Sequence, residues 1–114
     1  MAFITEMTGK PLTTLKHSVA NTAETLVDDV TGYVNQYLGK NVTACLITCE
    51  TNDIRFAWGA DPTGSGGANF GHILAATQSL KLTNHAQIAD FRFCNKTADS
   101  VAVLHITPEL STVY

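Results

Sequence analysis

Short segments in which apolar and polar residues alternate follow one another along the chain, separated by turn-forming residues. The clearest is Val42–Glu50, which is apolar on both faces and therefore predicts a central strand or one in a sandwich core. Residues 54–58 alternate with Ile54, Phe56 and Trp58 on one face. The turn signal at 51–53 lies between these two segments, so the pattern predicts a β-hairpin.

Three further segments, 79–83, 91–94 and 100–107, carry the same strand pattern, and Pro108 is expected to end the last of them. Short strands are also expected between Leu15 and Val30. A one-turn helix is expected at 87–90, and either a helical turn or a loop packed by two tyrosines at 31–38, before a turn at 39–41.

The chain is thus expected to hold about seven or eight short strands, with turns every 8–12 residues or so. No stretch longer than about ten residues has the apolar spacing of an amphipathic helix. We therefore predict an all-β fold, a small antiparallel β-sandwich or barrel of jelly-roll type.

The N-terminal residues 1–16 do not follow the strand pattern, because a Gly-Lys-Pro run at 9–11 interrupts any regular element. This segment is either a frayed terminus or an extended arm that docks on a neighbouring subunit, with a reach of roughly 50 Å. We divide the chain into an N-terminal arm, 1–16, and a β-sandwich domain, 17–114. The apolar arm residues without an evident partner are Phe3, Ile4 and Met7.

Composition and net charge exclude several classes of protein. The chain has 114 residues, enough for one domain, and is 45% hydrophobic but only 15% charged, which excludes a disordered chain. It lacks an apolar run of about 20 residues and a secretory signal pattern, so we expect no membrane association. The net charge of −3 argues against nucleic acid as a partner.

The glycine-rich segment 59–71 is the main candidate for a binding loop. It has no P-loop lysine, and its glycines do not form a dinucleotide-binding fingerprint before a helix. We expect no cofactor there. The simplest interpretation is an excursion between two strands, and the alternative is a contact loop for another protein.

The cysteines and histidines do not form a recognisable catalytic or metal motif. Cys45 and Cys49 would lie about 13 Å apart on one strand, too far for a disulfide, so buried thiols are expected. A zinc site with His105 or Cys94 is the alternative. No nucleophile elbow occurs, so we expect no enzyme. The four histidines, expected to be structural or at the surface, are His17, His72, His85 and His105.

The aromatic residues of the second half are expected to lie in the core, since few basic residues are interleaved with them for stacking on nucleic acid. They are Phe56, Trp58, Phe70, Phe91 and Phe93.

Several short motifs resemble a family of small virion proteins of tailed bacteriophages. They are IRFAWGADPT (54–63), GHIL (71–74), SLKL (79–82), IADFRF (88–93) and VAVLHITPE (101–109). The resemblance covers about residues 24–109, while the GSGGANF insertion and the N-terminal arm depart from the family pattern. It implies a structural role in the virion and no catalysis. Within these motifs, Arg55 and Arg92 are expected to face away from the aromatic residues and to pair with acids such as Asp61 or Asp90.

The leading hypothesis is a capsid decoration protein, a homotrimer or other homo-oligomer, that binds the major capsid protein or other virion proteins through the arm and the 59–71 loop. The alternatives are a neck, tail or fibre attachment protein and a carbohydrate- or receptor-binding module. In that last case Trp58, Phe70 and His72 would be exposed. The expected partner-binding residues are Phe3, Ile4, Met7, Pro11, Thr63, Asn69 and Phe70.

Overall fold

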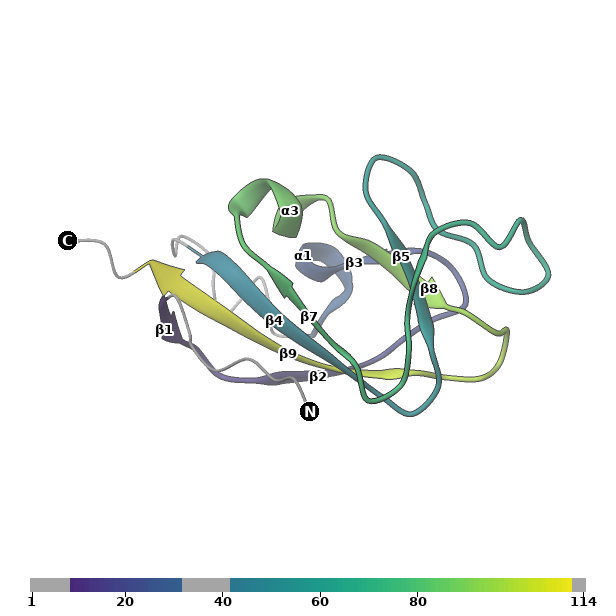
Figure 1. Ribbon diagram of the computed structural model, residues 1–114, viewed down its shortest axis with the longest axis horizontal. Helices are drawn as coiled ribbons and strands as arrows, with labels where there is room; N and C mark the ends of the chain where they lie inside the picture. The colour runs from purple at the N-terminus through teal and green to yellow at the C-terminus, as the bar shows by residue number, and fades with distance from the viewer. Residues whose placement is uncertain (1–8, 32–41, 112–114) are drawn as a thin grey trace.

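Two antiparallel sheets pack face to face in the computed structural model, which describes residues 9–31 and 42–111 (Figure 1). The first sheet has the order β1-β9-β4-β7, with β2 also paired to β9. Its strands are β1 (Gly9–Pro11), β2 (Leu15–Ser18), β4 (Val42–Glu50), β7 (Ser79–Leu82) and β9 (Val103–Ser111). The all-β sandwich expected from the sequence is confirmed.

The second sheet is smaller and has the order β3-β8-β5-β6. Its strands are β3 (Glu24–Thr25), β5 (Ile54–Ala57), β6 (His72–Leu74) and β8 (Arg92–Asn95). Two short helices, α1 (Leu26–Asp29) and α3 (His85–Ala89), lie in the connections between strands. The expected central position of β4, the strand at β7 and the helix at α3 are confirmed.

The core lies between the sheets and takes apolar side chains from both. Ile47, Leu104 and Ile106 come from the first sheet, and Ile54 and Phe93 from the second; all five are fully buried. Period-2 alternation produces this core, since inward residues of each strand meet those of the opposite sheet.

The expected hairpin between 42–50 and 54–58 is wrong, because β4 and β5 belong to different sheets. Both edges of β4 are already occupied, one by β9, which is equally long, and the other by β7. The three residues 51–53 therefore carry the chain across the sandwich. Thr51 (φ 50°) and Asn52 (φ 61°) both adopt the left-handed conformation there.

Pro108 does not end the last strand, which continues to Ser111. A residue's N–H and C=O point to the same side of a strand, and the Pro108 carbonyl accepts from Leu12 N–H at 2.8 Å. The Pro108 nitrogen therefore faces residues 12–14, which lie between β1 and β2. The sheet pairing is interrupted there, so it needs no N–H donor at position 108.

The assignment of 1–16 to a separate arm needs correction from residue 9 onward. Gly9–Pro11 pairs with the end of β9, and Leu15–Ser18 pairs with its beginning. Leu15 and His17 of β2 are half-buried while Lys16 and Ser18 are exposed, so one face of the strand turns toward the interior. Within the described residues β2 pairs with β9 alone, and it therefore lies at an edge of the sheet. Residues 1–8 lie outside the described residues, as do the elements expected at 32–41.

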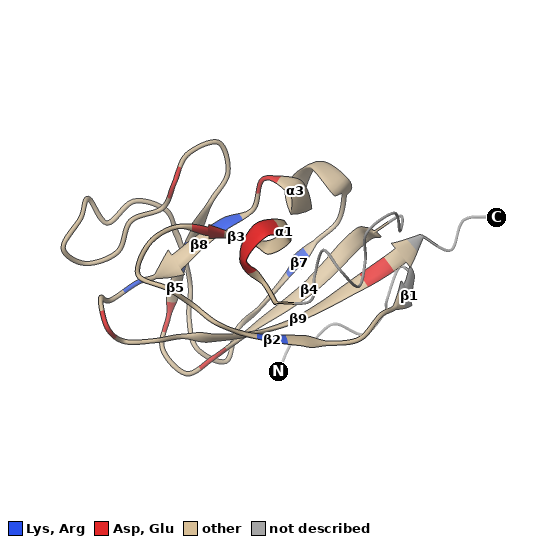
Figure 2. Cartoon of the chain, turned by 180° about the vertical axis from the view of Figure 1, so that it is seen from behind, with Lys and Arg blue, Asp and Glu red and all other residues tan. Residues whose placement is uncertain are grey.

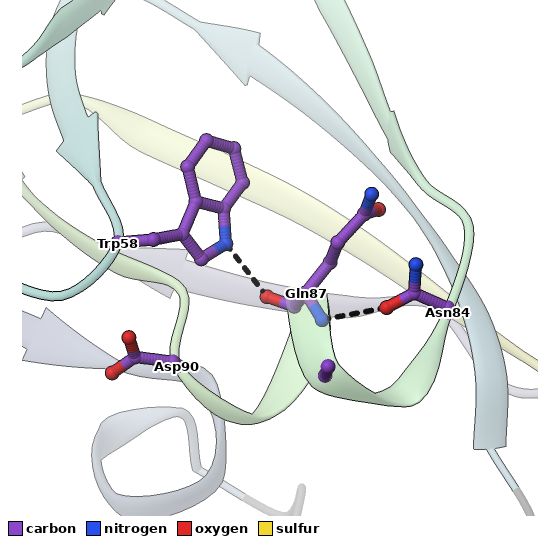
Figure 3. A pocket seen from close by; sticks show the side chains of 5 residues that line it. Trp58, Asn84, Gln87 and Asp90 are labelled. Atoms are coloured by element: carbon purple, nitrogen blue, oxygen red, sulfur yellow. Dashed lines mark hydrogen bonds between the residues drawn. The ribbon is translucent and has the colours of Figure 1, made fainter.

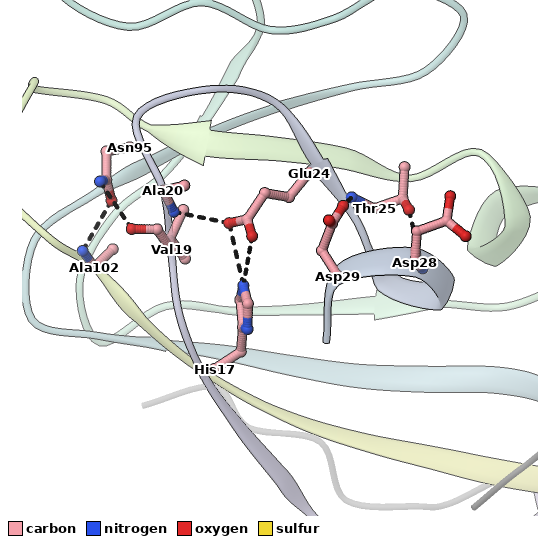
Figure 4. Close-up of polar contacts among 9 residues, drawn as sticks. All are labelled: His17, Val19, Ala20, Glu24, Thr25, Asp28, Asp29, Asn95 and Ala102. Carbon is pink, nitrogen blue, oxygen red and sulfur yellow. Dashed lines mark hydrogen bonds and ion pairs between the residues drawn. The ribbon is translucent and has the colours of Figure 1, made fainter. Parts of the chain in front are cut away.

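Helix α1 replaces the continued strand and turn expected at 26–29. Its N-cap, Thr25, accepts a hydrogen bond from Asp28 N–H at 3.2 Å, and Asp29 accepts one from Thr25 N–H at 2.7 Å (Figure 4). This reciprocal capping satisfies the N–H groups at the start of the helix.

A buried asparagine joins the two sheets where the chain passes between them. The amide nitrogen of Asn95 donates to the Val19 carbonyl at 2.9 Å and to Asn21 Oδ1 at 3.0 Å. Its Oδ1 accepts from Ala102 N–H at 2.9 Å, and its backbone N–H donates to the Ala20 carbonyl (Figure 4). Asn95 in β8 thus holds both the segment that leaves β2 and the segment that enters β9.

We predict that Asn95→Ala lowers the free energy of unfolding by about 3 kcal/mol, because the Ala102 N–H and the Val19 carbonyl lose their buried partner. Asn21→Ala, at an exposed position in the same network, should cost about 1 kcal/mol or less. Urea unfolding followed by circular dichroism measures both. Equal losses in the two variants would contradict the assigned role.

Candidate interaction surface

The glycine-rich segment forms a loop, residues 58–71, between neighbouring antiparallel strands β5 and β6, so the expected excursion between two strands is confirmed. Hydrogen bonds close its base. Thr63 N–H donates to the Phe70 carbonyl at 3.0 Å, and Phe70 N–H donates to Thr63 Oγ1 at 3.1 Å. Arg55 Nη1 donates to the Gly71 carbonyl at 2.8 Å.

The middle of the loop packs against the end of β8. A Cβ atom on Gly64 would lie 2.2 Å from the Asn95 carbonyl oxygen, so only glycine fits there. Ser65 N–H donates to the Lys96 carbonyl at 2.9 Å, and Ser65 Oγ accepts from Ala98 N–H at 2.7 Å. The loop is thus held in one arrangement despite its glycine content.

An ion-pair cluster fixes the entry of the loop. Arg92 donates to Asp90 through Nε (3.0 Å) and Nη2 (2.8 Å) and to Asp61 through Nη1 (3.1 Å), as expected for this arginine. Asp90 also accepts from Gly59 N–H, and these bonds hold the pKa of its carboxyl below the ordinary value. Arg55 differs from the expectation: within the described residues it forms no ion pair, and its Nε is buried without a partner.

Two of the expected core aromatics are exposed instead. Phe56, Phe91 and Phe93 are buried, but Trp58 is 39% exposed and Phe70 47%. Both exposed residues belong to the loop rather than to a strand, so neither is forced into the space between the sheets.

The exposed side chains at the loop exit and on the following edge strand form what we call the β6 patch: the apolar Phe70 and Ile73 and the polar His72. His72 and Ile73 are successive residues of β6 and face opposite sides of the strand. Ile73 is 48% exposed. No Lys, Arg, Asp or Glu occurs from Pro62 to Leu80, and the red segment that Figure 2 shows on the loop is Asp61 at its entry. This stretch of chain carries no charge of its own, but Arg55 is the cross-strand partner of Ile73 and donates to the Gly71 carbonyl, so one arginine lies beside the patch.

The expected partner-binding residues do not form one site. Thr63 closes the base of the loop, Asn69 is exposed with a left-handed backbone (φ 54°), and Phe70 lies in the β6 patch. Pro11 is exposed in β1, at the opposite end of the molecule from the loop (Figure 1). Phe3, Ile4 and Met7 lie outside the described residues.

A second surface feature lies between Trp58 and helix α3, and we call it the Trp58 groove (Figure 3). It is a shallow hollow of about 410 Å³ lined by Trp58, Asn84, Ala86, Gln87 and Asp90. Trp58, Phe70 and His72 are all exposed, as the carbohydrate- or receptor-binding alternative expected, but the core assignment of Trp58 hid its contact with helix α3. The sequence does contain a sign of the helix that lines the groove: the Asn84-x-x-Gln87 spacing resembles a capping box at the start of α3.

Two of the histidines, His17 and His105, contact a carboxylate and link different parts of the fold. His17 Nε2 lies 3.1 Å from both carboxylate oxygens of Glu24, which also accepts from Ala20 N–H (Figure 4). His105 Nε2 lies 2.7 Å from Glu50 at the surface, and this contact lowers the pKa of the Glu50 carboxyl. The first pair links β2 of the first sheet to β3 of the second, and the second pair links the neighbouring strands β9 and β4.

The three cysteines are buried free thiols. Burial raises the pKa of Cys45 to about 12 and that of Cys49 to about 11, and it also raises the pKa of Cys94. Among the described residues, no three histidine, cysteine or acidic side chains are grouped to hold a metal ion. Neither helix in that part of the chain is long and apolar enough to cross a membrane.

No model of a known protein family, no curated protein sequence and no solved structure matches this chain. Its function is therefore argued from the β6 patch and the Trp58 groove.

We predict that the native protein does not react with Ellman's reagent at about pH 8, because thiolate is the reactive form and burial raises all three pKa values. After unfolding in guanidinium chloride, all 3 thiols should react. Absorbance of the released nitrothiobenzoate measures both states. Rapid reaction of even one thiol in the native protein would contradict this burial.

Proposed function

We propose that this protein is a structural protein of a tailed-bacteriophage particle, specifically a decoration protein that binds the major capsid protein. The observation that carries the proposal is the exposure of two large apolar side chains of the β6 patch, Phe70 and Ile73, on a loop and edge strand already held in place. Charged residues are depleted and aromatic residues enriched at the centres of protein interfaces. The motif resemblance supplies the virion as the setting.

The loop's hydrogen bonds favour binding by this surface. Thr63, Arg55 and Ser65 fix the loop before any partner arrives, so little conformational entropy is lost on docking. Burying a Phe or Ile side chain contributes about 1.5–3 kcal/mol. A contact of this size is weak for one copy, but many copies on a symmetric shell add their contributions.

The two ends of the molecule suit a bridge between neighbouring shell subunits. Strand β1 lies at one end, and the loop between β5 and β6 lies at the other (Figure 1). Under the proposal, the β6 patch contacts one subunit and the β1 end contacts the next or a second copy of this chain. A homotrimer would place such contacts around a threefold axis of the shell.

Particles that lack this protein test the proposal. Purified protein is added to them, and the bound fraction is measured by cosedimentation. Phe70→Ser and Ile73→Ser should each weaken binding about tenfold, since each removes one buried apolar side chain. Val101→Ser is the matched control, because Val101 is equally exposed (47%) but lies in the β8–β9 connection. Equal binding by all three variants would overturn the role of the β6 patch.

Copy number distinguishes decoration from attachment at the neck, tail or fibre. Quantitative mass spectrometry of complete particles should give about one copy per capsid subunit, as a shell-wide contact requires. About 3–12 copies per particle would instead indicate the neck or a fibre. Absence from particles would refute a virion role.

A further inference from the structure

The Trp58 groove has a different chemistry from the β6 patch. It places an aromatic ring, two carboxamides and a carboxylate around one open hollow of about 410 Å³, within the range of small-molecule sites. Figure 3 shows the indole of Trp58 and the amides of Asn84 and Gln87 on the same side of helix α3.

The indole ring is fixed at this surface. Trp58 Nε1 donates to the Gln87 carbonyl at 2.9 Å, so one end of the ring is tied to the helix. The ring also contacts Phe56 edge-on at 5.6 Å and Phe91 at 5.7 Å between centroids. Trp58 nevertheless remains 39% exposed, which leaves an ordered apolar surface open to solvent.

Both carboxamides are oriented with their nitrogens free to donate. Asn84 Oδ1 accepts from Gln87 N–H at 2.9 Å, and Gln87 Oε1 accepts from Thr83 N–H at 2.7 Å. A backbone N–H can only donate, so each side-chain oxygen must face it and each NH₂ group must face away. The helix cap thus holds two amide donors in fixed positions beside the groove.

Asp90 supplies an acceptor at the same place. Its carboxylate receives two hydrogen bonds from Arg92 and one from Gly59 N–H, and a carboxylate has about four acceptor positions. One position therefore remains for a ligand hydroxyl. Arg92 is shared between Asp90 and Asp61, so this cluster keeps a net negative charge, and the residues that line the groove include no cation for an anionic ligand.

We infer that the Trp58 groove binds one ring of a neutral pyranose sugar. The C–H face of a pyranose ring is apolar and fits an aromatic surface, while adjacent hydroxyls accept from amide donors and donate to a carboxylate. The groove adjoins the β6 patch, since the rings of Trp58 and His72 lie 6.5 Å apart, but its lining residues are different ones. Sugar binding goes beyond a decoration role, since it would give a particle-bound protein a ligand outside the particle. A proline-rich peptide is the competing occupant of a groove with one tryptophan.

The test uses the whole chain and a panel of neutral disaccharides: cellobiose, maltose, lactose and chitobiose. Trp58 is the only tryptophan of the sequence, so its fluorescence reports on this groove alone. At least one disaccharide should change its emission saturably, and isothermal titration calorimetry should give the same affinity. No saturable change with any of the four, or saturation by a proline-rich peptide instead, would overturn the inference.

Two conservative variants separate sugar binding from folding. Gln87→Glu and Asn84→Asp keep the oxygens that cap the helix but remove the NH₂ donors, so the fold should persist while affinity falls about tenfold or more. Phe70→Ser should leave sugar affinity unchanged, although it weakens docking on particles. Unchanged affinity in both carboxylate variants would overturn the inference without affecting the proposed virion role.

Discussion

The buried amide of Asn95 is the contact on which the rest of the sandwich depends. Apolar contacts between the two sheets have no preferred direction, so directional hydrogen bonds between the sheets add to what packing fixes. Asn95 lies in the second sheet but bonds to Val19 and Ala102, which flank strands of the first. The carboxamide thereby sets the relation between the sheets with directional bonds in a buried site.

The same residue also sets the position of the glycine-rich loop. Gly64 packs against the Asn95 carbonyl, and Ser65 bonds to the next residue, Lys96. The loop is therefore fixed to the part of β8 where the two sheets are joined. An apolar side chain displayed on such a loop, such as Phe70, is held ready for a partner instead of being free to collapse onto the core.

The sequence predicted strands well and their partners poorly. Alternation identifies Val42–Glu50 and Ser79–Leu82 because burial of one or both faces is a local property of the pattern. Pairing is not local: a short turn such as 51–53 is equally compatible with a hairpin and with a crossing between sheets. Pro108 was misread for a related reason, since its tolerance depends on the interruption between β1 and β2, far away in the sequence.

Sequence reasoning identified only part of the candidate site. Phe70 and the loop were identified from glycine content, but aromatic residues were assigned to the core by type, which placed Trp58 wrongly. Whether an aromatic residue is inside depends on where its strand ends. Ala57 is the last residue of β5, so Trp58 lies one position beyond the sheet, where the ring covers Phe56 and Phe91 from outside.

The two surfaces share a support but differ in what they can recognise. Phe56 contacts Trp58 on one side and His72 of the β6 patch at 5.4 Å, so one buried ring orders both. The β6 patch offers the exposed apolar area of Phe70 and Ile73, which suits a flat protein surface from which water is excluded. The Trp58 groove adds oriented donors and an acceptor, which suit a ligand rich in hydroxyls. A single small core can thus support two chemically distinct surfaces. Trp58 at the loop entry and His72 on the edge strand both contact Phe56, and the chain extends from them in different directions.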